Sequence, residues 1–172
     1  MTSRNTFLDD TGDIQLAKHR VFRETDSVRF HDLTIEGSNG LDLVEHTGRA
    51  TSPPLNAQGE KQWYIHKHQT DNNRVIQGQR LFELYFDGFE HPHWLVFLTP
   101  DSGALRIPPN CYHRSVSCKG GSLLLNHAIR DEYYDENEEF HPATVHPKNL
   151  QNPWCHGITL AEAQAFLKNG EL

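Results

Sequence analysis

Two histidines separated by one residue are the first groups in this sequence whose type and spacing point to chemistry. His66 and His68 lie in the segment Gln62–His68, which is rich in strand-forming residues. Because side chains alternate across a strand, both imidazoles would lie on one face, with Tyr64 beside them. Two neutral imidazoles placed in this way can bind a metal ion or transfer protons near neutral pH. Simple polar alternation on a surface strand gives the same pattern, so the pair alone decides nothing.

A second block supplies a third histidine. It reads Ile107-Pro-Pro-Asn-Cys-Tyr-His113 and begins about 30 residues after Gly78. The two blocks resemble the paired motifs of the cupin superfamily, HxHx(3–4)Ex(6)G and Gx(5)PxGx(2)Hx(3)N, over about residues 60–130. The matching positions are His66, His68, Gly78, Pro108 and His113. Asn110 stands at a motif glycine, and asparagine tolerates a positive φ; Ser117 replaces the final asparagine.

The motif glutamate is not present. Counting forward from His68, its position falls on Asn72 or Asn73, and counting back from Gly78 it falls on Asp71. A metal site could still form from His66, His68 and His113, completed by Asp71 or water and with one coordination position open. That alternative is a metal-dependent cupin oxygenase, lyase or isomerase with one divalent ion (Fe, Mn, Ni or Zn).

One branch of the cupins matches the wider sequence better. The block ending at His113, the run Leu123–Leu125 and the acidic segment Asp131–Phe140 together resemble the RmlC-like dTDP-4-dehydrorhamnose 3,5-epimerases and dTDP-4-keto-6-deoxyhexose ketoisomerases. The resemblance implies a metal-free isomerase or epimerase of a keto-sugar, with a nucleotide sugar as substrate and no cofactor. It also implies that His66 and His68 form the acid/base pair.

The expected chemistry gives roles to further residues. A carbon next to a ketone is acidic enough for an imidazole to deprotonate, and the enolate oxygen then needs a donor. Candidate donors are Tyr64, Tyr112 and His113. Substrate contacts are expected from Gln69, Gln77, Arg106, Arg114, Asn126 and Tyr133. The branch usually carries an arginine for the nucleotide phosphate just before its histidines, where this sequence has Tyr64 and Ile65, so Arg74, Arg80, Arg106 or Arg114 would have to replace it.

The elements around these residues indicate an all-β fold. Alternating or apolar runs such as Gln79–Phe86 and Trp94–Leu98 recur every 8–12 residues or so, which predicts a cupin-type antiparallel β-barrel (jelly roll). The expected organisation is an N-terminal arm over 1–28, the barrel over 29–158 and a helix over 159–170 packed on the barrel. Thr159 and Glu162 form a capping box for that helix. The acidic segment 131–139 is expected to be a solvated loop.

Composition excludes several classes of function. The 172-residue chain has 16 Lys+Arg against 23 Asp+Glu, with no basic patch of the kind that binds nucleic acid. No apolar stretch is long enough to span a membrane. Three cysteines without a CxxC pair, and an N-terminus without an apolar signal region, predict a cytoplasmic protein. The arm and exposed strand edges predict a homodimer that binds a small molecule, and a non-catalytic ligand-binding barrel stays open as a third function.

Overall fold

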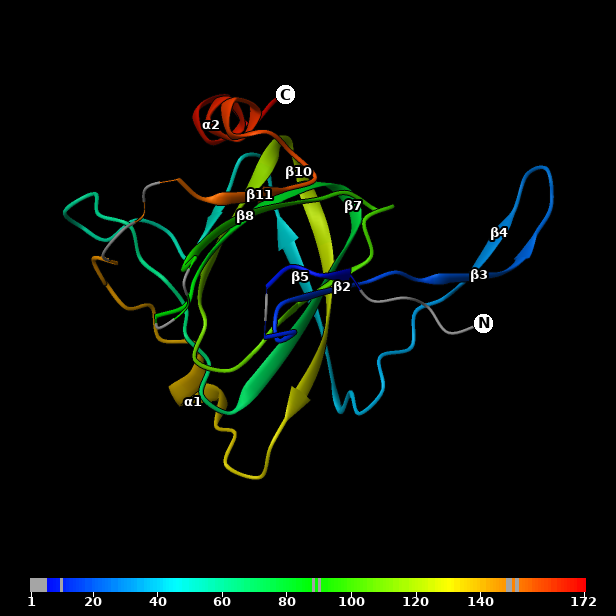
Figure 1. The fold of residues 1–172 in the computed structure, drawn as a ribbon, viewed down its shortest axis with the longest axis horizontal. Coiled ribbons are helices and arrows are strands. Elements are labelled where there is room, and N and C mark those ends of the chain that lie inside the picture. The colour runs from blue at the N-terminus through cyan, green and yellow to red at the C-terminus, as the bar shows by residue number, and fades with distance from the viewer. Residues whose placement is uncertain (1–5, 10, 88, 90, 148–149, 151) are drawn as a thin grey trace.

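Two long antiparallel strands organise the whole fold. The computed structural model describes residues 6–9, 11–87, 89, 91–147, 150 and 152–172. Within them, β7 (Gln69–Tyr85) and β10 (Tyr112–Arg130) pair along almost their full length (Figure 1). The first half of β7 also pairs with β9 (Ala104–Ile107), and the second half with β8 (His93–Leu98). The pairing is continuous and forms one nine-stranded sheet that curves into the barrel, and the two halves of β7 lie in its two facing parts, called here the first and the second sheet.

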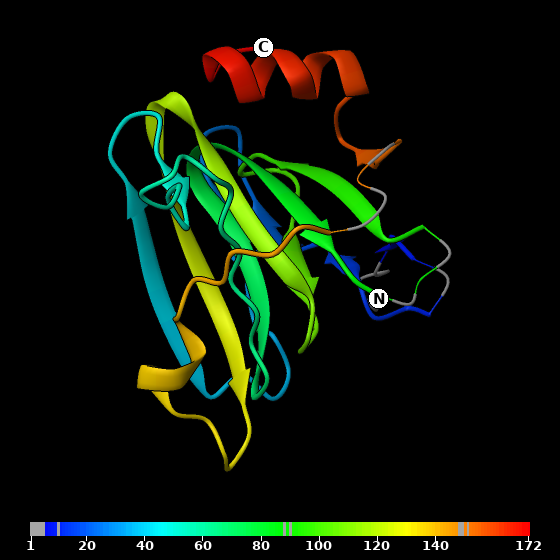
Figure 2. The same cartoon turned by 90° about the vertical axis from the view of Figure 1, so that its left-hand side faces the viewer.

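Shorter strands complete these sheets. β2 (Gln15–Ala17) extends the first sheet beside β9, followed by β1 (Thr6–Phe7), and β5 (Gly40–His46) closes its other edge against β10. β6 (Thr51–Ser52) pairs with β10, and β11 (Trp154–His156) runs parallel to β8. Figure 2 shows the curved arrangement from the side. The predicted antiparallel cupin-type barrel with a short C-terminal helix is confirmed, and β11 is its one parallel pairing among the described residues.

The apolar core fills the space between the two sheets. Leu105, Ile107 and Leu124 from the first sheet pack in one buried cluster with Leu84 and Val96 from the second. A smaller cluster lies under the C-terminal helix α2 (Leu160–Asn169), where Ala163 and Phe166 are fully buried. The capping box of Thr159 and Glu162 is present, and Gly170 ends the helix with φ 74°. No helix within the described ranges has the length and apolarity needed to cross a bilayer.

At one level that contains glycines, both long strands change which of their two faces points into the barrel. Gly78 lies within β7 with φ 75° opposite Ser122. Pairing slips at this level, where residues 118–121 of β10 have no regular partners. Such a bulge moves a strand's side chains to the opposite face. Asp71 and Asn73 therefore point inward before it, and Arg80 and Phe82 point inward after it.

The N-terminal part contains a separate two-stranded hairpin. β3 (Arg20–Glu24) pairs with β4 (Arg29–Asp32), and Figure 1 shows the pair projecting from the barrel. Residues 1–5 and 10 of the predicted arm lie outside the described residues. The division into arm, barrel and helix stays a prediction, although β2 pairs within the barrel sheet and the hairpin spans the boundary at residue 28.

Candidate functional site

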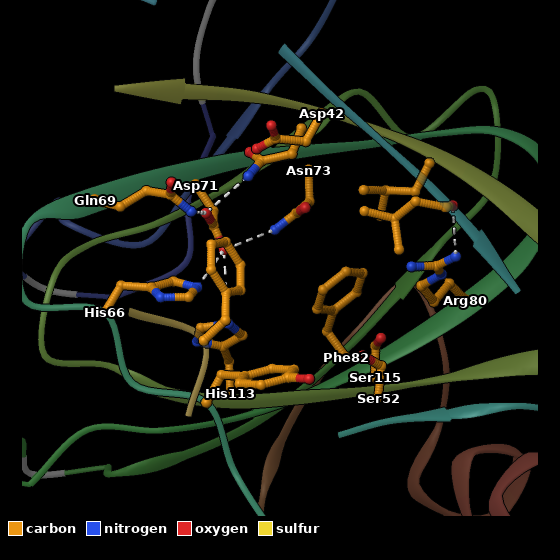
Figure 3. A pocket seen from close by; sticks show the side chains of 15 residues that line it. Asp42, Ser52, His66, Gln69, Asp71, Asn73, Arg80, Phe82, His113 and Ser115 are labelled. Carbon is orange, nitrogen blue, oxygen red and sulfur yellow. Dashed lines mark hydrogen bonds and ion pairs between the residues drawn. The ribbon is translucent and has the colours of Figure 1, made fainter. Parts of the chain in front are cut away.

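A polar pocket of about 250 Å³ lies between the sheets inside the barrel (Figure 3). Strands β5, β6, β7 and β10 provide most of its wall, together with the segment around Tyr64 and the end of the acidic segment. The lining residues are Asp42, Val44, Ser52, Tyr64, His66, Gln69, Asp71, Asn73, Arg80, Phe82, His113, Ser115, Leu124, Asn126 and Phe140.

Two imidazoles and one carboxylate converge in this pocket. The Nε2 atoms of His66 and His113 each lie 3.6 Å from the same oxygen, Oδ2 of Asp71. The two rings have centroids 4.8 Å apart, and all three residues are buried. They reach the site from a bend, from β10 and from β7 respectively. Strand pairing therefore contributes more to assembling this cluster than closeness along the chain does.

The backbone fixes which nitrogen of each ring faces the cluster. Nδ1 of His66 lies 2.9 Å from the carbonyl oxygen of Glu139, and Nδ1 of His113 lies 3.1 Å from that of Cys111. A carbonyl only accepts, so each Nδ1 carries a proton, and each Nε2 faces Asp71; without a further proton, each Nε2 is an acceptor. Three acceptor atoms therefore face one another, and a shared proton or a cation between them would remove their repulsion.

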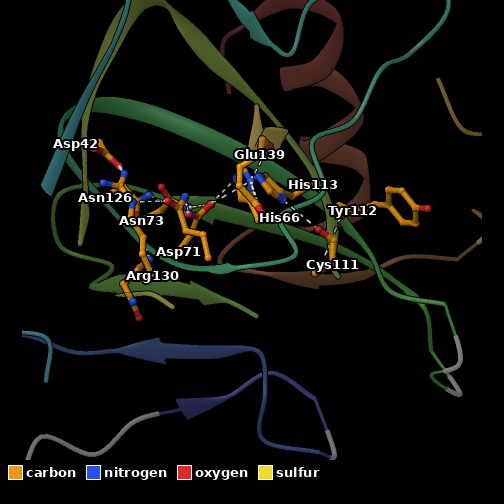
Figure 4. A network of polar contacts seen from close by, with 12 residues as sticks. Asp42, His66, Asp71, Asn73, Cys111, Tyr112, His113, Asn126, Arg130 and Glu139 are labelled. Atoms are coloured by element: carbon orange, nitrogen blue, oxygen red, sulfur yellow. Dashed lines mark hydrogen bonds and ion pairs between the residues drawn. The ribbon is translucent and has the colours of Figure 1, made fainter. Parts of the chain in front are cut away.

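Amide groups hold the Asp71 carboxylate in place (Figure 4). Oδ1 accepts hydrogen bonds from the side-chain nitrogens of Gln69 at 2.7 Å and Asn126 at 2.9 Å, and Oδ2 accepts from Asn73 at 3.5 Å. Hydrogen bonds of this kind fix the position of a buried carboxyl group. Gln69 and Asn126 line the pocket, and their predicted substrate contacts stay a prediction, while Asn73 adds a residue that the sequence did not single out.

The end of the acidic segment forms part of the site. The expectation of a solvated loop over 131–139 is wrong for Glu139, which ends the short helix α1 (Glu136–Glu139) and is 4% exposed. Its carboxylate accepts hydrogen bonds from the backbone nitrogens of Lys67 at 2.8 Å and His68 at 3.1 Å. These contacts fix the bend that carries His66 into the pocket.

The pairing of His66 with His68 on one strand face is not observed. After the isolated bridges at Trp63 and Tyr64 the chain bends instead of continuing as a strand, so alternation no longer applies. The His68 side chain is 36% exposed, and its Nδ1 lies 3.0 Å from Oδ2 of Asp131. His113, and not the predicted His68, lies beside His66. The ligand set expected for a metal therefore loses His68 and keeps the other three residues.

The other predicted site residues divide between the pocket and the outside. Tyr64 lines the pocket, but Tyr112 lies beside Tyr85, pointing away from Asp71 (Figure 4). Four further residues lie outside it. Arg114 is on the outer face of β10 beside Glu83, Arg106 is on the outer face of β9, Gln77 is exposed, and Tyr133 is 70% exposed near His68. Strand alternation excludes the two arginines, since His113, Ser115, Leu105 and Ile107 occupy the inward positions.

Burial shapes the protonation of His113. Desolvation lowers its pKa, the neighbouring His66 lowers it further, and the carboxylate of Asp71 acts in the opposite direction. His113 is therefore neutral at pH 7, with its Nε2 lone pair available in the pocket. A group of this kind is suited to take a proton from a bound ligand.

A second buried histidine gives a prediction about stability in acid. Burial, with a smaller contribution from the charge of Arg80, lowers the pKa of His46 to about 4. A histidine that resists protonation in the folded state costs stability as pH falls from 6.5 towards 4. We expect the free energy of unfolding to drop by on the order of 1–2 kcal/mol more in the wild type than in His46→Gln between pH 7 and 4.5, after allowance for solvent screening. Urea unfolding at both pH values measures this. The exposed His141→Gln is the control, and equal losses in wild type and His46→Gln would contradict the prediction.

The fold is that of enzymes acting on dTDP-linked sugars. A dTDP-4-dehydrorhamnose 3,5-epimerase from Sulfolobus tokodaii superposes with a TM-score of 0.62 at 15% identity, covering 91% of this chain and 92% of that one. NovW, a 4-keto-6-deoxy sugar epimerase from Streptomyces spheroides, gives 0.62 at 12% identity, with 96% and 91% covered. The 3,4-ketoisomerase QdtA from Thermoanaerobacterium thermosaccharolyticum, in complex with TDP-4-keto-6-deoxyglucose, gives 0.54 at 18% identity, with 73% and 84% covered.

At the level of sequence there is no comparable match. No family model matches this chain, and no curated protein matches it. The structural likeness confirms the RmlC-like barrel that the block ending at His113, the run Leu123–Leu125 and the acidic segment predicted. At these identities it establishes the fold, and the chemistry has to be argued from the pocket itself.

Proposed function

We propose that this protein is an isomerase or epimerase of a keto-sugar, with a nucleotide sugar as its substrate. The observation that carries the proposal is the convergence of two imidazole Nε2 atoms on one buried carboxylate oxygen, 3.6 Å from each. The fold supports it, because proteins of the same architecture include a ketoisomerase crystallised with TDP-4-keto-6-deoxyglucose.

In the proposed reaction, an acid and a base act from one wall of the pocket. Neutral His113 removes the proton from the carbon next to the ketone, since its Nε2 lone pair faces the cavity. A proton shared between Nε2 of His66 and Oδ2 of Asp71 is delivered to the second position. General acid/base catalysis by positioned groups contributes roughly 10²–10⁴-fold. The hydroxyl of Tyr64, which also lines the pocket, is the donor placed to stabilise the enolate oxygen.

Exchange with solvent tests this function directly. Incubating the protein with TDP-4-keto-6-deoxyglucose in D₂O should place deuterium next to the ketone, as followed by mass spectrometry and NMR. Binding of the sugar without deuterium uptake or a new isomer would instead indicate a non-catalytic ligand-binding barrel. A matched sample of heat-denatured protein controls for spontaneous exchange.

A divalent metal ion is the second candidate at this position. His66, Asp71 and His113 each offer one ligand atom, and these atoms lie within 4.8 Å of one another. The donor set fits, because the Nδ1 hydrogen bonds to backbone carbonyls orient both rings as in many metal sites. A bound ion would polarise the substrate carbonyl as a Lewis acid. His66 and His113 would then serve as ligands in place of acid and base.

Elemental analysis distinguishes the two candidates. We expect protein purified without added metal to contain less than stoichiometric Fe, Mn, Ni or Zn, and deuterium exchange to survive dialysis against EDTA. About one ion per chain in the wild type, lost in His113→Asn and retained in His68→Asn, would favour the metal-dependent enzyme.

We also propose that the chain acts as a homodimer. The β3–β4 hairpin pairs with no other strand among the described residues, and Phe22 and Phe30 on it are 58% and 38% exposed. An isolated two-stranded hairpin is marginally stable in water, so a covering partner is expected. Sedimentation at twice the mass of the chain, reduced to a single chain in a Phe22→Ser and Phe30→Ser double variant, is the expected result. A monomeric wild type at micromolar concentration would contradict it.

A further inference from the structure

Arg80 places a positive charge in the pocket on the side opposite the histidine cluster. It follows the glycine bulge of β7 and is 2% exposed. Figure 3 shows it facing Gln69 and His66 across the cavity, with Phe82 nearby. The reversal of the inward face at Gly78 is what brings this side chain inside.

The guanidinium has only neutral partners among the described residues. Nε donates to Oγ of Ser122 at 3.0 Å, and Nη2 donates to the carbonyl oxygens of Val44 at 3.3 Å and Ser122 at 3.4 Å. No described residue accepts from Nη1. Desolvation lowers the pKa of Arg80 to about 10, and no carboxylate offsets this effect. The charge is therefore buried without a counter-ion.

The other buried arginines among the described residues are paired with a carboxylate or lie outside the pocket. Arg114 faces Glu83 at 3.6 Å on the outer side of β10. Asp42, the second carboxylate that lines the pocket, is paired with Arg130 at 2.7 Å. Since a buried unpaired charge is strongly unfavourable, an anion that arrives with the ligand would complete the site.

Two hydroxyl groups lie on the same part of the wall. Ser52 of β6 and Ser115 of β10 are direct partners in the strand register, and both line the pocket. Neither side chain has a hydrogen-bond partner among the described residues. Two hydroxyl donors beside a planar guanidinium match the hydrogen-bonding needs of an oxyanion.

We propose that Arg80, Ser52 and Ser115 bind an oxyanion of the substrate, either a phosphoryl group or a carboxylate of the sugar. This inference rests on the proposed function for the identity of the ligand as a sugar derivative. It adds that the ligand spans the pocket, with its anion at Arg80 and its ketone at His66 and His113. Arg80 would thereby take over the phosphate contact expected before the histidine block, or select an acidic sugar.

Calorimetric titration with matched ligands tests the proposal. Binding of TDP is compared with binding of thymidine to test for a phosphoryl group. Binding of glucuronate is compared with binding of glucose to test for a carboxylate. We expect one anionic ligand to bind the wild type more tightly than its neutral partner, and Arg80→Met to weaken that binding roughly 10- to 100-fold. Arg106→Met, outside the pocket, is the control and should bind as the wild type does.

Stability separates a binding arginine from a structural one. Replacing an unbalanced buried charge by an apolar side chain of similar size is often neutral or stabilising, so Arg80→Met should keep or raise the Tm without ligand. The anionic ligand should then raise the Tm of the wild type and not that of the variant. If Arg80→Met does not fold, Ser115→Ala decides, since a several-fold loss of affinity supports the proposal and unchanged affinity overturns it.

The two proposals fail in different ways. Unchanged anion affinity in Arg80→Met, or equal binding of charged and neutral ligands to the wild type, overturns the anion site even where deuterium exchange occurs. Loss of anion affinity in Arg80→Met without any exchange in the wild type keeps the anion site and removes the isomerase.

Discussion

Substituting His113 by asparagine is expected to lower kcat for the isomerisation by about 10²–10⁴-fold, with little change in KM. Asparagine keeps a donor towards the Cys111 carbonyl, whose oxygen lies 3.1 Å from Nδ1, and removes the Nε2 lone pair that faces Asp71. Because the substitution removes the base and preserves most of the packing, substrate affinity should change far less than turnover. Initial rates and solvent-deuterium uptake measure the two effects separately.

His68→Asn is the matched control for this experiment. His68 belongs to the same HxH motif as His66, but its ring lies outside the pocket beside Asp131. We expect its turnover to stay within about threefold of the wild type, as is usual for exposed substitutions away from reacting atoms. If His68→Asn abolished exchange and His113→Asn did not, the assignment of the base would be wrong.

Gly78→Ala is expected to destabilise the fold by about 3–5 kcal/mol. The residue has φ 75°, which alanine adopts at a cost, and a Cβ there would lie 2.3 Å from the carbonyl oxygen of Gly121. This carbonyl belongs to the paired strand, so the clash can be relieved only by moving β10. The loss should appear in urea unfolding as a lower midpoint, and the variant should also lose activity.

Gly59→Ala separates the cost of a positive φ from the cost of the clash that the added Cβ makes. Gly59 has φ 78°, but nothing lies within 4 Å of a Cβ at that position. Its loss should therefore be limited to the backbone term of about 1–2 kcal/mol. Similar unfolding midpoints for the two variants would show that the close approach of β7 and β10 is unimportant.

Local signals in the sequence predicted local structure well. The Thr159 and Glu162 capping box and the glycine after the helix specify α2 without help from distant residues. Asn110 has φ 64°, as expected for a residue at a motif glycine. The repeated apolar runs predicted the barrel because each strand buries one face. Of the three motif histidines, His66 and His113 meet in one cluster with Asp71, and His68 lies outside it.

Errors arose where distant contacts override a local pattern. The predicted position of His68 is wrong because Glu139, which is far along the chain, binds the backbone at 67 and 68 and bends it. The sequence alone does not distinguish Arg80 from the three other candidate arginines, because alternation counted from Asp71 is interrupted at Gly78. Counting alternation separately on each side of that glycine would have placed Arg80 and Phe82 inside.

The hydrogen bond from His66 to the Glu139 carbonyl has a consequence for synthesis of the chain. It joins residues 73 positions apart, and Asn126 contacts Asp71 across 55 positions. A nascent polypeptide that has not yet released residue 139 from the ribosome therefore lacks the contacts that orient both His66 and Asp71. Ligand capture can begin only after residue 139 has emerged, and a premature stop before that point leaves strands without a working cavity.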